Sequence, residues 1–479
     1  MDSTTASYRS AAAAQLPSAG TAAPRHHVPG RRARLDAAIR VAAGSTLWLS
    51  LLVVTYWWVV GRGIQAMDDW ESGLTSAGRL TGLLASDLLL AQVLLIARIP
   101  VIEHAFGQDR VLRIHRIVGF TSLNLMLSHL ALITWGYAAG RVTALPSTFW
   151  DLTTNYPGVL LALAGTACLV LTVVTSVRAA RRRLRYESWH LLHLYAYLGV
   201  GLALPHQLWT GQEFISSPAA TAYWWTVWGV TAAAVLVWRV GLPLVHSARH
   251  RLRVASVADE GNGVVSVYLT GRRLDRLGAE AGQFFTWRFL NRAGWTRGNP
   301  YSLSAAPSGQ SLRISVKALG DNSQSLRGLR PGTAVLVEGP YGRLSARART
   351  GRKVVLIGAG VGITPLRALA EGLEYGPGEA ILLQRYTGTP LFDRELRMLA
   401  DTRGLLVGVL PGHRRAPGSW LGPGADHLDD VAALRTWIPD IADRDVYVCG
   451  PDPWTESVER AARAAGVPAD RIHLENFSW

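Results

Sequence analysis

The sequence predicts a multidomain membrane protein: a six-helix transmembrane bundle, then an antiparallel β-barrel, then an α/β domain with a parallel sheet. The first observation is that the 479 residues are 49% hydrophobic, with the apolar residues concentrated before residue 245. The second is strand-like alternation after residue 250, as in 264–269 and 312–316. The third is a strand, glycine loop and helix order that begins at Lys353. We therefore expect domains at 1–37, 38–246, 250–348 and 350–479.

The first domain is expected to be a disordered basic tail. It is rich in Ala, Ser, Thr and Pro and ends in a run of arginines at 31–34. No apolar core lies near its start, so it is not a standard signal peptide. Six apolar segments follow, each close to the ~20 residues that cross a bilayer. We place these spans at about 38–61, 79–102, 115–137, 157–178, 189–209 and 222–244.

Charge sets the expected topology. The tail, the 103–113 loop, the 178–185 run and the exit at 249–253 are basic, whereas the 62–75 loop is acidic. Basic loops stay on the cytoplasmic side. We therefore expect a multi-pass protein of the cell membrane, with its N-terminus and its C-terminal domains in the cytoplasm.

Composition also excludes several classes of site. The net charge is +15, but the arginines cluster beside apolar spans, so we expect the lipid bilayer rather than nucleic acid as the partner. No obligate protein partner is evident. Only two cysteines occur, Cys168 and Cys449, so an all-cysteine iron–sulfur cluster or zinc site is not expected.

Two spans each carry a pair of histidines. His115 and His129 are fourteen residues apart, and His193 and His206 are thirteen apart. Each gap covers about 20 Å of helix, most of a ~30 Å hydrocarbon core. Haem iron with two imidazole ligands has no open position and passes electrons without binding substrate. We predict two b-type haems, an inner one on His115 and His193 and an outer one on His129 and His206.

Two alternatives accompany that assignment. The histidines could instead hydrogen-bond neighbouring helices or line a proton path, and His190 competes with His193 as a ligand. Thirteen residues also leave His206 about 140° from the helix face of His193. We therefore expect a local distortion at Pro205.

The soluble half carries two cofactor motifs. Tyr301 and Ser302 follow a probable barrel strand, where an aromatic ring and a hydroxyl can contact a flavin. Lys317, Gly320 and Ser323 supply a cation, a turn and a hydroxyl that can hold a pyrophosphate.

A glycine loop, 358–365, links a strand to a helix and makes an anion site at the helix N-terminus. A later strand ends in Cys449, Gly450 and Pro451, at the sheet edge where ligands bind. Arg385 replaces the acidic residue that often binds a ribose hydroxyl in NAD-specific enzymes, and a guanidinium suits a 2′-phosphate. This favours NADPH over NADH.

The order of these motifs, together with Glu-Gly-Pro-Tyr-Gly at 338–342, resembles the ferredoxin–NADP reductase superfamily. The membrane half resembles the ferric-reductase-like transmembrane domain of NADPH oxidases and ferric reductases. That likeness rests on the spacing of the four histidines, on His115-Arg116-x-x-Gly119, and on the six spans.

The resemblance implies roles for single residues. Tyr301 and Ser302 would contact the FAD ring, and Lys317, Gly320 and Ser323 its phosphates. Cys449 would lie close to the nicotinamide, and Phe477, or alternatively Trp479, would shield the flavin. The nicotinamide nucleotide would lie on Gly358, Gly360, Gly362, Thr364, Pro365, Gly450 and Pro451, with Arg385 at its adenosine ribose or phosphate.

The expected activity is transfer of electrons from cytosolic NAD(P)H through FAD and two haems to an acceptor outside the membrane. Dioxygen, reduced to superoxide, is the first expectation. Arg79 is expected at the outer end of the second span, and the resemblance to NADPH oxidases implies that it lies near the outer haem. A ferric chelate is the alternative acceptor. A membrane transporter or redox sensor with a regulatory nucleotide domain is the alternative of another class.

Overall fold

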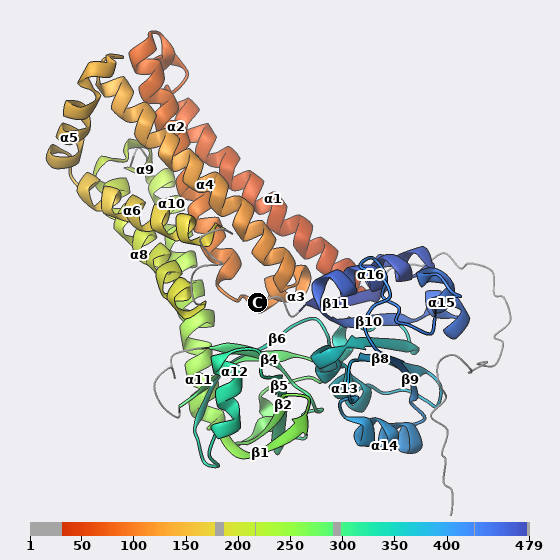
Figure 1. Cartoon of the computed structure of the whole chain (residues 1–479). Helices are drawn as coiled ribbons and strands as arrows, with labels where there is room; N and C mark the ends of the chain where they lie inside the picture. Colours follow the sequence, from red (N-terminus) through yellow and green to blue (C-terminus); the bar gives the residue numbers. More distant parts are fainter. Residues whose placement is uncertain (1–30, 178–185, 216, 291–297, 426, 477–479) are drawn as a thin grey trace, which may run out of the picture. The chain divides into compact units, whose positions relative to one another are not determined.

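The computed structural model describes residues 31–177, 186–215, 217–290, 298–425 and 427–476. The chain divides into two compact units, with a boundary between Gly241 and Leu242. Leu35–Gly241 is the helical unit, and the unit from Leu242 onward holds the sheets (Figure 1).

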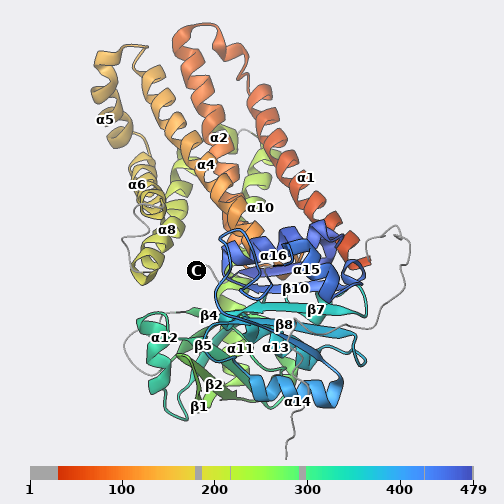
Figure 2. The same ribbon diagram turned by 45° about the vertical axis from the view of Figure 1, so that its right-hand side comes forward.

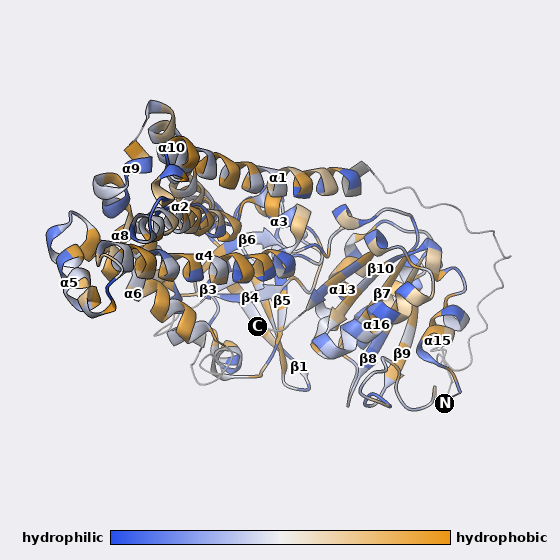
Figure 3. Cartoon of the chain, turned by 90° about the horizontal axis from the view of Figure 1, so that it is seen from above, coloured by the Kyte–Doolittle hydropathy of each residue, from blue (hydrophilic) through white to orange (hydrophobic). Residues whose placement is uncertain are grey.

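The helical unit consists largely of long helices. They are α1 (Arg31–Val60), α2 (Trp70–Ile96), α3 (Pro100–Phe106), α4 (Gln108–Tyr137), α5 (Leu145–Asn155), α6 (Val159–Ser176), α8 (Tyr186–Thr210), α9 (Gln212–Ile215) and α10 (Pro218–Ala234), then a π-helical stretch (Val235–Gly241). Helix α2 packs along α4, and α6 along α8. Hydrophobic residues follow the lengths of these helices (Figure 3).

Five helical segments among the described residues are long and apolar enough to cross a membrane. They are Arg34–Val60, Trp70–Ile96, Arg110–Tyr137, Val159–Ser176 and Pro218–His250. Helix α8, which carries His190, His193 and His206, is not among the five. The chain therefore has several helices that are apolar enough to span a membrane, and the count of six stays a prediction.

The second span begins earlier than the sequence predicted. The Asp69 side chain accepts hydrogen bonds from the backbone N–H groups of Glu71 and Ser72, both at 2.9 Å, so α2 starts at Trp70 rather than near residue 79. It ends at Ile96, before the separate helix α3. Arg79 lies nine residues after the start of α2, and its place relative to the outer membrane surface stays a prediction.

The second unit opens with α11 (Leu242–His250), which packs on strand β6. Its antiparallel strands are β1 (Arg253–Gly261), β2 (Val264–Thr270), β3 (Phe284–Phe289), β4 (Asn299–Ser302), β5 (Ser311–Lys317) and β6 (Val335–Tyr341). They form two three-stranded sheets, β1-β2-β5 and β4-β3-β6. Isolated bridges, Leu303 to Ile314 and Arg253 to Ala334, link the sheets where the sequence predicted one barrel.

The last part is a parallel sheet with the order β11-β10-β7-β8-β9. The strands are β7 (Val354–Ala359), β8 (Ala380–Tyr386), β9 (Leu406–Pro411), β10 (Asp445–Gly450) and β11 (Ile472–Asn476), and the helices are α13 (Ile363–Gly372), α14 (Asp393–Arg403), α15 (Asp430–Trp437) and α16 (Asp452–Ala464). Hydrophobic residues fill β7 and β10 (Figure 3). The predicted parallel α/β arrangement is present.

Candidate functional site

The four membrane histidines form two facing pairs. The rings of His115 and His193 have centres 6.2 Å apart, and those of His129 and His206 are 6.3 Å apart. His115 and His129 come from α4, whereas His193 and His206 come from α8. The pairing that the sequence predicted is therefore the pairing that the structure contains. Helix α8 continues through Pro205, and the local distortion expected there stays a prediction.

The two histidines of α4 donate from Nδ1 to backbone carbonyls of α2. Nδ1 of His115 lies 3.3 Å from the oxygen of Gln92, and Nδ1 of His129 lies 2.8 Å from that of Gly78. A carbonyl oxygen can only accept, so the proton of each ring is on Nδ1.

The histidines of α8 reach the same state through hydroxyl groups. Nδ1 of His206 is 2.6 Å from Oγ1 of Thr210, which itself donates to the His206 carbonyl. Nδ1 of His193 is 3.3 Å from Oγ of Ser176, which itself donates to the Thr172 carbonyl. Because each hydroxyl donates its one proton to a backbone carbonyl, its oxygen accepts a hydrogen bond from Nδ1 of the histidine ring.

This arrangement fits a metal between the two rings of each pair. A neutral imidazole protonated at Nδ1 keeps its lone pair on Nε2, and metal-binding histidines usually donate their other nitrogen in this way. Bonds between a metal and an imidazole nitrogen are about 2.0–2.1 Å long, as found for zinc. Two such bonds, with the distance from nitrogen to ring centre added on each side, separate the two ring centres by about 6 Å. The observed spacings match that value.

Two further features bear on the metal. Gly82 gives His129 room, because a Cβ at that position would lie 2.5 Å from Nδ1 of the ring. Among the described residues, no group of three or more His, Cys, Asp or Glu could hold a metal ion. Pairs of histidines suit haem iron, because the macrocycle supplies its remaining ligands.

The charge of Arg79 is compensated. Its guanidinium forms an ion pair with Glu213, a buried residue of α9. This contact was not predicted, since the two residues are 134 positions apart. Arg79 is thus part of a neutral pair rather than an isolated positive charge.

The flavin motif places one unsatisfied polar atom in a buried position. Ser302 ends β4, is 5% exposed, and its Oγ has no hydrogen-bond partner among the described residues. Burial raises the pKa of the adjacent Tyr301, so its hydroxyl stays protonated. A buried hydroxyl without a partner is costly, and a bound flavin could supply the missing hydrogen bond.

The predicted phosphate loop is shaped by its own serine. Oγ of Ser323 accepts from the N–H groups of Leu319 at 2.9 Å and Gly320 at 3.0 Å. Lys317 ends β5 and is exposed. The hydroxyl of Ser323 therefore orders the turn, and Lys317 places an exposed cation near it.

The glycine loop has the expected geometry for a nucleotide. Gly360 has a φ of +58° and open space where a Cβ would point. The adjacent Gly362 packs against the next strand, and a Cβ there would lie 2.3 Å from the carbonyl oxygen of Cys449. Helix α13 then begins at Ile363, and no side chain caps its first N–H groups. Such an uncapped N-terminus attracts an anion.

Cys449 lies beside this loop at the carboxyl end of β10. Its register partners are Gly358 on β7 and Glu475 on β11, so the predicted nucleotide residues meet at one sheet edge. The thiol is fully buried, and burial, with the neighbouring charge of Glu475, raises its pKa well above the ordinary value. The Cys449 thiol is therefore neutral rather than a thiolate nucleophile.

Arg385 is more constrained than the sequence implied. It is 6% exposed and donates to the carbonyls of Trp420 at 3.1 Å and Gly412 at 3.0 Å. Burial and the charge of Arg414 lower its pKa. Arg414 follows β9 and is partly exposed, so a phosphate at this edge would meet two guanidinium groups.

A buried ion cluster joins the flavin segment to the nucleotide helix. Arg313 on β5 binds both carboxylate oxygens of Glu395 on α14, at 2.7 and 2.9 Å, and donates to the carbonyl of Ser304 at 2.7 Å. Arg367 on α13 lies 2.6 Å from the same carboxylate and 3.2 Å from the same carbonyl. Ser304 lies two residues after Ser302, and Arg367 three after Thr364. Sequence reasoning missed this cluster, in which Arg313 and Glu395 are 82 positions apart.

The hydrogen-bond partners of the histidines were also missed. Gln92, Gly78 and Ser176 lie on other helices and leave no local signal. Thr210 is the exception, because it is four residues from His206 and so on the same helix face.

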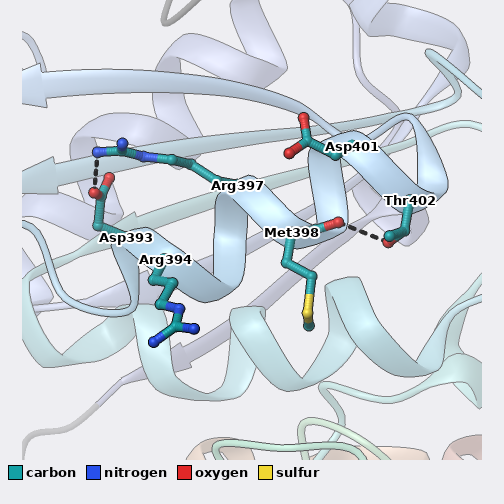
Figure 4. A pocket seen from close by; sticks show the side chains of 6 residues that line it. All are labelled: Asp393, Arg394, Arg397, Met398, Asp401 and Thr402. Atoms are coloured by element: carbon teal, nitrogen blue, oxygen red, sulfur yellow. Dashed lines mark hydrogen bonds and ion pairs between the residues drawn. The ribbon is translucent and has the colours of Figure 1, made fainter. Parts of the chain in front are cut away.

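A surface pocket lies away from these motifs, on α14. Its six lining residues all come from α14: Asp393, Arg394, Arg397, Met398, Asp401 and Thr402 (Figure 4). None of them was predicted to bind a cofactor. Phe477 and Trp479 lie outside the described residues.

Known proteins resemble each of the two parts of the chain. Residues 81–204, which include three of the four paired histidines, match the family of the ferric reductase like transmembrane component. The chain is 33% identical over 244 residues to the flavohemoprotein of Chromobacterium violaceum, covering 47% of this chain and 59% of that protein. It is 30% identical over 238 residues to the ferredoxin reductase component of the 3-ketosteroid-9-alpha-monooxygenase of Mycolicibacterium smegmatis, covering 47% and 65%.

The chain thus spans about 59–65% of the length of these two relatives. Among solved structures, the FAD/NAD-binding domain of the Vibrio cholerae nitric oxide dioxygenase is 26% identical, with a TM-score of 0.37 over 48% of this chain and 99% of that chain. The cytochrome b5 reductase domain of the Ulva prolifera nitrate reductase is 16% identical, with a TM-score of 0.38 over 48% and 98%. The chain therefore joins a ferric-reductase-like transmembrane domain to a flavin-reductase-like module.

Proposed function

We propose that this fusion of a ferric-reductase-like transmembrane domain with a flavin-reductase-like module carries electrons from cytosolic NAD(P)H across the membrane. The observation that carries the proposal is the pair of facing histidines at two levels of the helical unit, each ring donating from Nδ1. When bound, FAD accepts a hydride from NAD(P)H, and haem iron takes the electrons one at a time.

The four histidines would hold two b-type haems. His115 and His193 lie nearer the cytoplasmic ends of α4 and α8 in the proposed topology, so they hold the inner one. His129 and His206 hold the outer one. The two histidines of each pair would complete the ligands of the iron, so the acceptor would be reduced without binding to the metal. Each charge that crosses fully couples to the membrane potential at about 2.3 kcal/mol per 100 mV.

In the second unit, residues position the two nucleotides. Tyr301 offers a ring and Ser302 a hydrogen bond to the flavin. The loop from Gly358 to Thr364 admits the nicotinamide nucleotide, and the neutral thiol of Cys449 forms a close surface at its reactive end. Phe477 is proposed to cover the flavin until the nucleotide arrives. With Arg385 and Arg414 at the sheet edge, the proposed donor is NADPH.

The proposed acceptor is dioxygen, which would leave as superoxide. Outer-sphere transfer to dioxygen needs access to the haem edge and no binding site of its own. The ion pair of Arg79 with Glu213 removes the extra positive charge that would assist it. A ferric chelate is therefore the second candidate, and the match to the ferric reductase like family favours it.

Proteoliposomes containing FAD, haem and NADPH test these acceptors. Under air, we expect NADPH consumption and a signal from a superoxide probe that superoxide dismutase abolishes. Negligible turnover under air, restored by a ferric chelate without oxygen, would replace dioxygen by the chelate. A purified protein without haem bands would instead favour a transporter or redox sensor and remove the proposal.

A further inference from the structure

A buried carboxyl group lies inside the membrane bundle, away from the histidines. Asp87 is in the middle of α2, is 2% exposed, and belongs to a helix whose only other acidic residue is Glu71, near its start. Ionisable side chains within membrane spans are costly and usually serve a function. Nothing in the electron path described above uses Asp87.

Three oxygen atoms from three helices meet at this position. Oγ of Ser50 on α1 donates to Oδ1 of Asp87 at 2.7 Å, and the hydroxyl of Tyr223 on α10 donates to the same atom at 2.9 Å. Ser50 and Tyr223 also lie 2.5 Å apart. Oδ2, in contrast, is buried and has no hydrogen-bond partner among the described residues.

No cation balances the carboxyl group within the described part of the bundle. On α10, Tyr223 is the only titratable residue, and on α1 the nearest cation is Arg40, ten residues before Ser50. On α2 itself, Arg79 is engaged by Glu213. Helix α4 presents His115 and His129 to carbonyls on another face of α2. A permanent negative charge on Asp87 would have no counter-charge nearby, so the site favours binding of a cation such as a proton.

The position of Asp87 along α2 lies between the positions that contact the two histidine pairs. Gly82 packs on His129, and the Gln92 carbonyl binds His115. Asp87 is five residues from each, which is about 7.5 Å along the helix and about 140° around it. It therefore lies between the two levels, on the face of α2 turned toward α1 and α10.

We propose that Asp87, held by Ser50 and Tyr223, is a proton-binding site that takes up one proton when an electron occupies the histidine-held iron centres. The inference rests on the proposed function. In this step ferric iron gains one electron from the NAD(P)H-derived pair, and the carboxylate gains one proton from water to become a carboxylic acid. Net charge within the bundle is unchanged, and when the electron leaves, the proton is released.

Infrared difference spectroscopy between the oxidised and reduced full-length protein tests the site. Reduction should produce a carboxylic-acid C=O stretching band that shifts in D2O. Asp87→Asn should abolish the band, and Glu213→Gln, which alters another buried carboxyl of the same unit, should retain it. Absence of the band in the unaltered protein, or its persistence in Asp87→Asn, would overturn the inference.

A second variant covers the case in which Asp87→Asn does not fold. Tyr223→Phe keeps the ring that packs on Trp57 but removes one hydrogen bond to Oδ1. The band should remain and change position, and an unchanged position would overturn the assignment. Haem absorption recorded on the same samples separates the two claims. Haem bands without the carboxyl band refute only the proton site, whereas absence of haem refutes the proposed function and the proton site with it.

Discussion

Replacing Glu395 with glutamine should remove the counter-charge of the buried Arg313 and one of the two carboxylates that contact the buried Arg367, which also pairs with Glu371. Arg313 and Arg367 have side chains only 7% and 5% exposed, and both contact this carboxylate. Removing one partner of a buried ion pair costs about 3–5 kcal/mol. The Glu395 side chain is 27% exposed, so solvent screening brings the expected loss to about 3 kcal/mol.

The assay is denaturant unfolding of a fragment starting at Leu242, with FAD present. Glu459→Gln is the matched control, because Glu459 pairs with Arg463 four residues along α16 in a more exposed setting. Such a pair is worth about 0.3–0.5 kcal/mol. If both variants lost the same stability, or if Glu395→Gln lost under about 1 kcal/mol, the cluster would not hold the two nucleotide-binding parts together.

The same cluster predicts a pH dependence. Burial raises the pKa of Glu395, but the hydrogen bonds and charges of Arg313 and Arg367 outweigh it, so the net shift is downward. A lowered folded-state pKa contributes stability above the unfolded value of about 4.3 and loses it as pH falls through the folded value. The difference between the native fragment and Glu395→Gln should therefore be constant near neutral pH and shrink only in acid. A difference that grew on acidification would contradict the sign.

Three other outcomes follow from the site. Ser302→Ala should weaken FAD binding by about 2- to 10-fold, the value of one hydrogen bond, and Tyr301→Ala combined with it should weaken binding further; unchanged affinity in an equilibrium titration would refute the flavin placement. Arg385→Ala and Arg414→Ala should each raise KM for NADPH more than for NADH, and equal effects on both nucleotides would exclude a phosphate contact. Glu213→Gln should leave Arg79 without its counter-charge and raise the rate of superoxide formation relative to ferric-chelate reduction; an unchanged ratio in proteoliposomes would show that this charge does not select the acceptor.

Local and periodic signals account for what the sequence could predict. The spacing of the histidines within each span implied which residues would face each other, and the glycine loop implied a helix N-terminus beside β7. The start of α2 was misplaced because the cap at Asp69 outweighed the hydropathy profile, which shifted Arg79 into the helix. The partners of Arg79, Asp87 and Arg313 lie on distant segments, so only the folded chain brings them together.

The most direct test of the central claim is the anaerobic absorption spectrum of the purified full-length protein before and after NADPH is added. We predict that NADPH produces reduced haem bands, that His193→Leu loses the inner haem, and that His190→Leu keeps both. His190 lies one turn from His193 on α8 and is the matched control. A spectrum without haem bands would contradict electron transfer through the histidine pairs. Loss of a haem in His190→Leu, with both retained in His193→Leu, would contradict the assigned ligands.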